Sequence, residues 1–398
     1  NFGQKPFKFP PPDGFQPLNL SNAQPEKVIA RPDQYVKPLI WSGDNTTRKI
    51  TTGHHPDLVW IKCRSDGAGH RLFDTVRGTI ESHRPGGANP VDTANQFGAI
   101  SAYHNDGFTL TPGSYSGYES GDVNMTGRTY LGWSWKAGGG SGATSGEYWI
   151  DDKQYADATA AGLNGGSGIT LSGASVGTKQ GFSILRYTGG ASGSTLSHGL
   201  SQAPDFFIIK NHSGDTQGSA GPHWYVKHKS VSGGTTGNDS VFLNLTNGQG
   251  NNGPHGICKT NGDSLLEFVD GSTNDVNWHT HDSAATYSCY AWHDIPGLQK
   301  FGSYVGNTTE GPFVELGFLP AILWIKCITQ TWYFAGFDSQ RPAYNPNDGR
   351  FIAFNNNGTE SSGVHNNLDF LSNGFRIRST SSNSEPTNLN NQTYIYCA

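Results

Sequence analysis

The stretch Pro56-Asp57-Leu58-Val59-Trp60-Ile61-Lys62-Cys63 decides the fold, because it recurs twice more along the chain. The other two copies read Pro204-Asp205-Phe206-Phe207-Ile208-Ile209-Lys210-Asn211 and Pro320-Ala321-Ile322-Leu323-Trp324-Ile325-Lys326-Cys327. Each is a short run of large apolar residues that ends on a lysine, which is typical of a buried β-strand. We call these runs the anchor strands. A pattern that recurs in the same order predicts a repeated structural unit.

The sequence around each anchor strand repeats as well. An aromatic-x-Gly sequence precedes each one, and from that aromatic residue to a second glycine there are 12, 12 and 13 residues. The anchor lysine lies 68, 77 and 68 residues before the tyrosine of a closing Thr-Tyr pair, at Tyr130, Tyr287 and Tyr394. Each copy is therefore a unit of roughly 100–115 residues with about seven or eight short strands, typical of an antiparallel sandwich or jelly roll.

Composition favours the same fold class. Glycine supplies 54 of the 398 residues, about twice its usual share of ~7 %, and only 15 % of residues are charged against ~25 % in an average domain. Glycine, Asn and Ser disfavour helices, whereas aromatic residues favour pleated surfaces. We therefore expect an all-β chain of three tandem jelly-roll-like β-sandwich modules with almost no helix.

The predicted organisation has five parts. Residues 1–27 are a Pro-rich connector, 28–138 are module 1, 139–180 are a Gly/Ser-rich insert, 181–295 are module 2, and 296–398 are module 3. The insert reads as flexible loops around a short ordered piece. Because the opening residues lack a leader pattern and Met125 is the only methionine, we expect the chain to be a piece of a longer protein.

Both faces of an anchor strand are apolar. Side chains alternate across a strand, so Leu58 and Trp60 point away from Val59 and Ile61. A sandwich strand normally buries one face only. The second face must be covered by a loop, by a neighbouring module or by another subunit, and the sequence leaves these three possibilities open.

Charge and motifs exclude several classes of function. The net charge of −5, without a Lys/Arg block, argues against binding to nucleic acid or to an anionic membrane. The longest apolar run has eight residues and contains Pro320, so no membrane insertion is expected. Five cysteines without C-x-x-C spacing are predicted to be reduced and mostly buried. No nucleophile-elbow, zinc-protease or P-loop motif occurs, and we predict no cofactor.

Several motifs of this chain resemble those of a family of large phage proteins, mostly tail-fibre or minor tail proteins of marine and cyanobacterial phages. The motifs are Asn1-Phe2-Gly3-Gln4-Lys5-Pro6-Phe7, Leu58-Val59-Trp60-Ile61-Lys62-Cys63-Arg64, Phe73-Asp74-Thr75-Val76-Arg77-Gly78, Trp133-Ser134-Trp135-Lys136-Ala137-Gly138-Gly139 and Gly181-Phe182-Ser183-Ile184-Leu185. The resemblance implies a virion structural protein of the phage tail, with residues 1–27 closing a preceding SPRY-like module. It also implies other virion proteins and a host-surface receptor as partners, and a homotrimer, because phage fibres are commonly threefold.

Catalysis finds little support in the residues. A glycosidase needs two carboxylates that flank the sugar. The pairs Asp151-Asp152 and Glu267/Asp270 have no counterpart in the other modules. We therefore predict that the protein is not an enzyme, and we keep a capsid-decorating protein and a polysaccharide-degrading tailspike as alternatives.

Adhesion to a glycan or protein receptor is the function that the loops favour. Planar aromatic side chains cover the apolar faces of sugars, and amide groups match the hydroxyls. The candidate receptor-binding residues are Tyr115, Tyr118, Asn251, Asn252, His255 and Trp332. By contrast, the repeated aromatic residues Trp60, Trp324, Tyr130, Tyr287 and Tyr394 are expected in the core. The repeated lysines Lys62, Lys210 and Lys326 are expected to extend their ammonium groups to solvent.

One candidate metal site appears in module 2. In the sequence Trp278-His279-Thr280-His281-Asp282, a strand would place His279 and His281 on one face, a spacing that suits a divalent metal. Two ligands make a weak site, and an ordinary polar face is the alternative.

Overall fold

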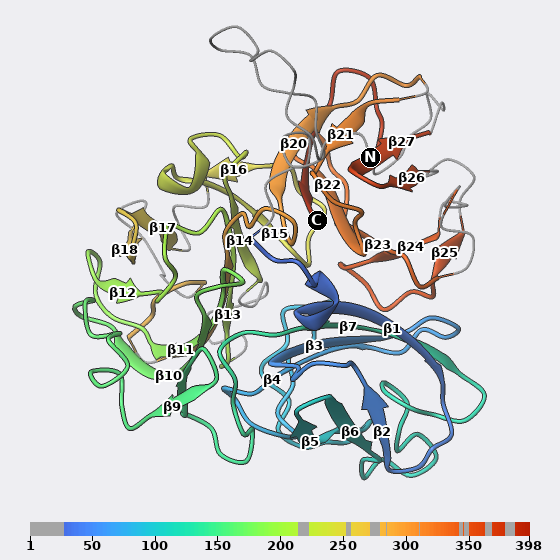
Figure 1. The fold of residues 1–398 in the computed structure, drawn as a ribbon, viewed down its shortest axis with the longest axis horizontal. Helices are drawn as coiled ribbons and strands as arrows, with labels where there is room; N and C mark the ends of the chain where they lie inside the picture. The colour runs from blue at the N-terminus through green and yellow to red at the C-terminus, as the bar shows by residue number, and fades with distance from the viewer. Residues whose placement is uncertain are drawn as a thin grey trace, which may run out of the picture.

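The computed structural model describes residues 28–213, 223–251, 256–270, 279–283, 285–309, 311–341, 345, 350–362, 368–378 and 387–398. Within these ranges the chain is all β, with two short 3-10 turns, η1 (Pro32–Gln34) and η2 (Gly234–Thr236), and no α-helix. No helix among these residues is long and apolar enough to cross a membrane. The predicted connector 1–27 lies outside the described residues. Figure 1 shows three β-rich lobes arranged around a common centre.

Module 1 is a sandwich of two antiparallel sheets. Its strands are β1 (Val36–Ser42), β2 (Arg48–Thr51), β3 (Leu58–Cys63), β4 (His70–Asp74), β5 (Ala99–His104), β6 (Gly107–Thr111) and β7 (Thr129–Trp135). The four-stranded sheet has the order β1-β7-β3-β4, and the three-stranded sheet has the order β2-β6-β5. The anchor strand β3 is therefore a central strand, between β7 and β4.

Module 2 repeats this topology within a larger sheet. Its strands are β11 (Phe182–Thr188), β12 (Thr195–Ser197), β13 (Phe206–Asn211), β14 (Tyr225–His228), β15 (Asp239–Phe242), β16 (Gly250–Asn251), β17 (Ile257–Asn261), β18 (Leu265–Val269) and β19 (Thr286–Trp292). The order β11-β19-β13-β14 matches that of module 1, and β12-β18-β17 forms the facing sheet.

The insert contributes three further strands to module 2. They are β8 (Tyr148–Ile150), β9 (Lys153–Tyr155) and β10 (Thr170–Gly177). β10 pairs with β11 in antiparallel fashion and with β8 in parallel fashion, so the sheet grows to nine strands. The interpretation of 139–180 as flexible loops around a short piece was therefore wrong in part. Glycine and serine have low intrinsic strand propensity, so the sequence did not indicate these strands. They form because β10 pairs with β11 at the edge of the module-2 sheet.

Module 3 has the same arrangement again. Its strands are β20 (Phe301–Val305), β21 (Phe313–Glu315), β22 (Ile322–Cys327), β23 (Ala335–Asp338), β24 (Arg350–Ala353), β25 (Ser361–Ser362), β26 (Leu368–Leu371), β27 (Gly374–Ile377) and β28 (Thr393–Cys397). The order β20-β28-β22-β23 faces β21-β27-β26. The anchor strands β3, β13 and β22 thus hold the same place in three sandwiches of one topology, which confirms the repeated β-sandwich predicted from the sequence.

Each sandwich has its own core between its two sheets. In module 1 this core holds one face of β3, namely Val59, Ile61 and Cys63. The corresponding faces of β13 and β22 lie in the cores of modules 2 and 3. The closing tyrosines are buried there, and each hydroxyl accepts a hydrogen bond of 2.8 Å from the backbone N–H five residues earlier, at Met125, Asp282 and Leu389. All five cysteines are buried and unpaired, as predicted.

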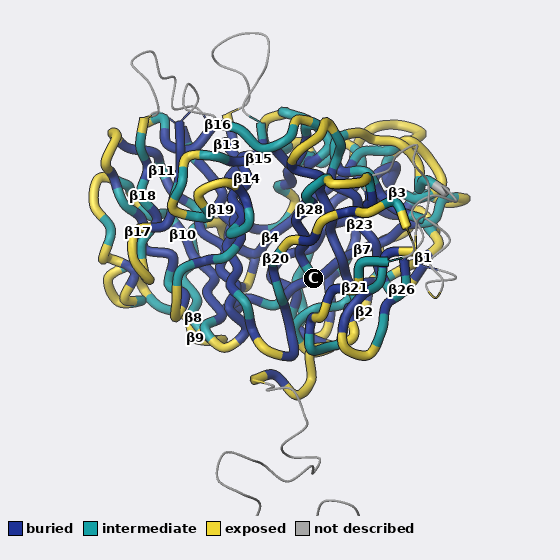
Figure 2. Tube along the Cα trace, turned by 90° about the horizontal axis from the view of Figure 1, so that it is seen from above, coloured by how far each residue is buried: buried dark blue, intermediate teal, exposed yellow. Residues whose placement is uncertain are grey.

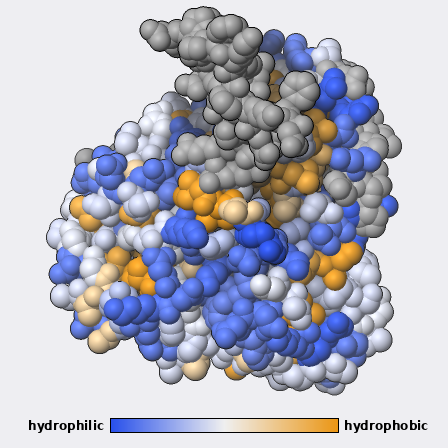
Figure 3. All heavy atoms as spheres, viewed as in Figure 1, coloured by the Kyte–Doolittle hydropathy of each residue, from blue (hydrophilic) through white to orange (hydrophobic). Residues whose placement is uncertain are grey.

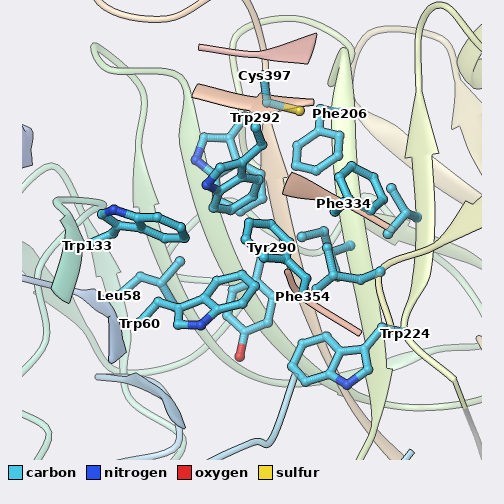
Figure 4. Close-up of a cluster of buried hydrophobic side chains, with 14 of the residues drawn as sticks. Leu58, Trp60, Trp133, Phe206, Trp224, Tyr290, Trp292, Phe334, Phe354 and Cys397 are labelled. Atoms are coloured by element: carbon cyan, nitrogen blue, oxygen red, sulfur yellow. The ribbon is translucent and has the colours of Figure 1, made fainter. Parts of the chain in front are cut away.

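The opposite faces of the three anchor strands meet one another. Leu58 and Trp60, Phe206 and Ile208, and Ile322 and Trp324 all belong to a single buried cluster. We call this cluster the hub, and Figure 4 shows its side chains converging from all three modules. Buried segments run through the middle of the molecule in Figure 2. The second apolar face is therefore covered by neighbouring modules of the same chain, and the modules surround a common core instead of forming a string.

Aromatic rings dominate the hub. The ring centroid of Trp60 lies 5.8 Å from that of Trp133 in its own module, 5.4 Å from that of Trp324, and 4.6 Å from that of Phe354. Trp324 and Phe354 belong to module 3. Such edge-to-face and tilted contacts each add about 0.5–1.5 kcal/mol to the burial of apolar area.

The anchor lysines cross from one module to the next. Lys62 Nζ donates to Asn357 O (3.3 Å) in module 3, Lys210 Nζ to Ala88 O (3.4 Å) in module 1, and Lys326 Nζ to Thr246 O (2.9 Å) in module 2. Modules 1, 3 and 2 are thereby joined in one cyclic order. All three lysines are at most 1 % exposed, so the expectation that they reach solvent was wrong. Their side chains point into the molecule, where backbone carbonyl groups of the adjacent module accept hydrogen bonds from the ammonium groups.

Two buried aspartates repeat the same cyclic order. Asp74 and Asp338 occupy equivalent ends of β4 and β23, and each binds an arginine three residues later, with Nε to Oδ2 distances of 2.6 and 2.8 Å. Asp74 also accepts a hydrogen bond from the Tyr290 hydroxyl of module 2 (2.7 Å), and Asp338 accepts one from Trp133 Nε1 of module 1 (3.2 Å). The seams between modules are therefore sealed by buried, charge-assisted hydrogen bonds.

We predict that Trp60→Ala destabilises all three modules together. Truncating a large, fully buried aromatic side chain costs about 3–5 kcal/mol, and Trp60 contacts rings of two modules. Denaturant unfolding, followed by circular dichroism and by limited proteolysis, should show a single transition of the whole chain at a lower denaturant concentration than in the wild type. The control is Trp332→Ala, because Trp332 is only half-buried. Separate transitions for module 1 and the rest would contradict a shared core.

We also predict a pH-dependent effect of Lys326→Met. Burial lowers the pKa of Lys326 to about 7, below its ordinary value of 10.5 in the unfolded chain. Between these values the unfolded state binds more protons, so this lysine makes the wild type more stable as pH rises. The variant should therefore lose stability relative to the wild type from pH 6 to pH 10. Urea unfolding across this range measures the difference, with Lys153→Met on the exposed β9 hairpin as control. If the difference in unfolding free energy between variant and wild type did not change with pH, the lowered pKa of Lys326 would be refuted.

Candidate functional site

The loop between β6 and β7 carries Tyr115 and Tyr118, two residues predicted to contact a receptor. Both are exposed, by 51 % and 49 %. Their ring centroids lie 6.3 Å apart, and the ring of Tyr115 also lies 5.1 Å from that of Phe97. Three aromatic rings thus form a continuous row on module 1. Adjacent exposed aromatic rings offer a flat apolar surface to a ligand.

Backbone hydrogen bonds hold this loop in place. Ser114 N and Tyr115 N donate to the carbonyl oxygens of Asn95 and Gln96, at 3.2 and 3.0 Å. The approach is close, because a Cβ on Gly113 would lie 2.2 Å from Asn95 O. Gly117 adopts φ = 82°, which the tight turn between the tyrosines requires. The tyrosines are therefore presented from a fixed backbone.

A polar cavity of about 420 Å³ lies next to the row of rings. We call it the module-1 cavity. Its lining residues are Asp66, Gly67, Ala68, Gly69, Arg84, Gly86, Gly87, Asn89, Phe97, Tyr118, Gly121, Asp122 and Arg128 of module 1, together with Asn357 of module 3. Its volume is in the range of about 300–1,000 Å³ that small-molecule sites occupy. The glycines of the lining carry no side chains, so a ligand can approach the backbone closely.

The ionisable groups of the wall are paired. Arg128 Nη2 forms an ion pair with Asp66, and its guanidinium carbon lies 5.7 Å from the ring centroid of Tyr118. Asp122 Oδ2 accepts from Arg71 Nε at 2.7 Å, and its Oδ1 accepts from Gly69 N at 2.9 Å. The cavity wall therefore presents two arginines and two aspartates with no net charge.

A third carboxylate, Asp92, binds the arginines of this site. Asp92 Oδ2 accepts hydrogen bonds from Arg71 Nη1 (2.5 Å) and Arg84 Nη2 (2.6 Å). Burial alone would raise the pKa of Asp92, but these hydrogen bonds lower it to about 2. Arg84 Nε and Arg71 Nη2 are buried with no hydrogen-bond partner in the part of the chain that is described. Arg84 also lines the cavity, and its side chain is 33 % exposed.

Among the described residues, the other receptor-binding candidates Asn251 and Trp332 do not line this cavity. Asn251 lies in β16 of module 2, and Asn252 and His255 fall outside the described residues. Trp332 lies in module 3, half-buried, with its ring 5.8 Å from that of Tyr333. Of the four candidates that lie in the described part of the chain, the structure brings Tyr115 and Tyr118 together.

His279 and His281 lie in a turn, so the prediction that they share one face of a strand was wrong. Both are buried. His279 lies against His223 and Phe242, with centroid distances of 5.8 and 5.2 Å. His281 Nε2 lies 3.2 Å from Asp270 Oδ1. The described residues contain no group of three His, Cys, Asp or Glu side chains placed to hold a metal ion.

Sequence reasoning missed the polar wall of the cavity. Arg84 comes from the β4–β5 loop, whereas Asp122 and Arg128 come from the β6–β7 loop, and the three share no spacing that marks a site. The one local signal is the pair of glycine-rich turns, Asp66-Gly67-Ala68-Gly69 and Pro85-Gly86-Gly87, because such turns allow close backbone approach to a ligand.

Comparison with known proteins identifies a family whose description assigns no function. Neither the curated proteins nor the solved structures contain a match to this chain. One family model, described as "Domain of unknown function (DUF7483)", matches residues 31–398. A single model thus spans all three modules, which agrees with their shared hub. The chain belongs to the DUF7483 family.

Proposed function

We propose that this protein is a non-enzymatic adhesive component of a phage virion, a tail fibre or minor tail protein, that binds a host-surface glycan at the module-1 cavity. The observation that carries the proposal is the pair Tyr115 and Tyr118, half-exposed on a fixed loop beside a charge-balanced polar cavity. The phage context rests on the resemblance of the sequence motifs.

The chemistry of a saccharide fits both parts of this site. The C–H faces of a sugar ring pack against aromatic rings, and its hydroxyls need donors and acceptors at short spacing. The tyrosines supply the first, and the polar side chains of Arg84 and Asn89 supply the second. Because the wall has no net charge, a neutral or zwitterionic sugar fits better than a strongly anionic one.

Binding without cleavage agrees with the state of the wall carboxylates. A glycosidase needs a protonated carboxylic acid and a second carboxylate across the glycosidic bond. In the cavity, Asp66 and Asp122 each form an ion pair with an arginine. These pairs occupy oxygen atoms that catalysis would need.

The expected homotrimer rests on the phage resemblance alone. The apolar faces of β3, β13 and β22 had left an intersubunit contact open, but the modules of one chain cover them. If fibres of this protein are trimeric, other surfaces must join the chains, and three copies of the module-1 cavity would then add avidity. Sedimentation equilibrium of the chain measures this state directly.

We expect the double variant Tyr115→Ala/Tyr118→Ala to bind host glycans about 5- to 140-fold more weakly, since it loses two aromatic contacts of ~0.5–1.5 kcal/mol each. A microarray of bacterial surface polysaccharides identifies the binding glycan, and calorimetry with that glycan gives the affinity. The control is Phe313→Ala, which removes an aromatic residue of similar exposure (47 %) from module 3. Equal affinity of the double variant and the wild type would rule out this site.

Incubation with the bound polysaccharide should leave its chain length unchanged by size-exclusion chromatography. Shortening of the polymer would point to the polysaccharide-degrading tailspike instead. Immunogold labelling of intact particles with an antibody to this chain should mark the tail. Label over the head would favour the capsid-decorating alternative.

A further inference from the structure

Each seam between two modules contains a buried histidine. His70 of β4 lies at the seam of modules 1 and 3, His83 at the seam of modules 1 and 2, and His228 of β14 at the seam of modules 2 and 3. All three residues are 0 % exposed or nearly so, and the Nε2 atom of each contacts a polar atom of the neighbouring module. We call these three residues the seam histidines.

His70 is held in one neutral tautomer by the groups around it. Its Nδ1 lies 3.0 Å from Trp60 Nε1, and an indole N–H can only donate, so Nδ1 must accept. Its Nε2 lies 2.9 Å from Asn356 O of module 3, and a carbonyl oxygen can only accept, so Nε2 must carry the proton. The neutral ring therefore links the hub to module 3.

His228 repeats this arrangement at the seam of modules 2 and 3. Ser230 N donates to its Nδ1 at 3.0 Å, and its Nε2 donates to Tyr396 O of module 3 at 3.1 Å. A proton added to either ring would sit on Nδ1 and face an N–H group, so the existing hydrogen bond would be lost. For His70 the lost donor is Trp60, whose ring lies in the hub.

The third seam histidine shares one hydroxyl group with another histidine. Nε2 of His83 lies 3.3 Å from Ser288 Oγ of module 2, and Nε2 of His212 lies 2.8 Å from the same oxygen. The two ring centroids are 4.9 Å apart. Protonation of both rings would place two positive charges close together in a buried site, where their repulsion is strong.

The charges around these rings also oppose protonation. None of the rings forms an ion pair with a carboxylate of the described residues. The charged side chains that face them are cations, namely Lys62 at His70, Arg77, Lys210 and Arg186 at the pair of His83 and His212, and Lys229 at His228. The carboxylates of Asp74 and Asp294 pair with two of these cations, Arg77 and Lys229.

Burial, with these cations, makes the closed molecule sensitive to acid. It lowers the pKa of His70 and His228 to about 3 and holds the pKa of His83 well below its ordinary value of 6.5. Below pH 6.5 each ring therefore binds a proton in the unfolded chain but not in the folded one. Stability falls as the pH falls through this range, by up to about tenfold in the unfolding constant per pH unit for each histidine.

We propose that the seam histidines make the module assembly acid-sensitive, so that their protonation breaks the hydrogen bonds between modules and opens the hub. Because the modules share one hub, the three seams respond together. Hydrophilic residues cover much of the face of the closed molecule seen in Figure 3. Acid would expose the indole rings of Trp60, Trp133 and Trp324 in addition. This inference concerns the assembly of the modules and does not depend on glycan binding.

The first experiment follows the full wild-type chain in urea just below its unfolding transition at pH 7.5. Lowering the pH to 5 should increase the radius of gyration in small-angle X-ray scattering. It should also shift the tryptophan fluorescence to longer wavelength, because the indoles of the hub reach water. If neither signal changed between pH 7.5 and pH 4, the proposal would be overturned.

The second experiment compares the single variants His70→Gln and His228→Gln with the wild type. A glutamine amide can donate to the same carbonyl oxygen but does not titrate. In urea unfolding between pH 6 and pH 4.5, the unfolding constant of each variant should change about tenfold less per pH unit than that of the wild type. The control is His104→Gln, because His104 is half-buried and contacts Thr109 of its own module (Nε2 to Oγ1, 2.7 Å).

The pH dependence separates protonation from a purely structural role of these histidines. The control variant should follow the wild type across the whole pH range. If His70→Gln and His228→Gln lost the same stability at every pH, only their hydrogen bonds would matter, and the acid response of the seams would be refuted.

Discussion

Burial of both faces of the anchor strands is the constraint on which the rest of the structure depends. One face of β3, β13 and β22 completes the sandwich to which each strand belongs, and the other face forms the hub. A module alone would expose Trp60 or its equivalents to water, at a cost of about 25 cal/mol for each Å² of apolar surface. Three modules remove this cost together, so the folding unit is the whole set and not a single sandwich.

Polar groups at the seams fix how the modules meet. Apolar contact alone is not directional, whereas a buried lysine must find carbonyl oxygens and a buried aspartate must find donors. Lys62, Lys210 and Lys326 each find them in the next module. Burial lowers the pKa of these lysines and so reduces the stability of the folded protein. The same buried lysines allow the three modules to join in one cyclic order only.

The proposed glycan site lies in loops at the surface of this scaffold. The module-1 cavity is built from turns at one end of a sandwich, and Asn357 reaches it from module 3 because the hub brings the two modules together.

The sequence by itself determined the fold class, the three repeats, the burial of the repeated aromatic residues, and the position of Tyr115 and Tyr118 in an exposed loop. Strand periodicity, repeat spacing and turn residues act locally, so they can be read along the chain. Only the tertiary structure decided that the modules surround a hub, that the insert adds strands to module 2, and that the anchor lysines are buried. It also decided that Arg84, Asp122 and Arg128 line one cavity. These features depend on contacts such as that of Trp60 with Phe354, between residues almost three hundred positions apart, and a contact at such separation leaves no periodic trace in a single sequence.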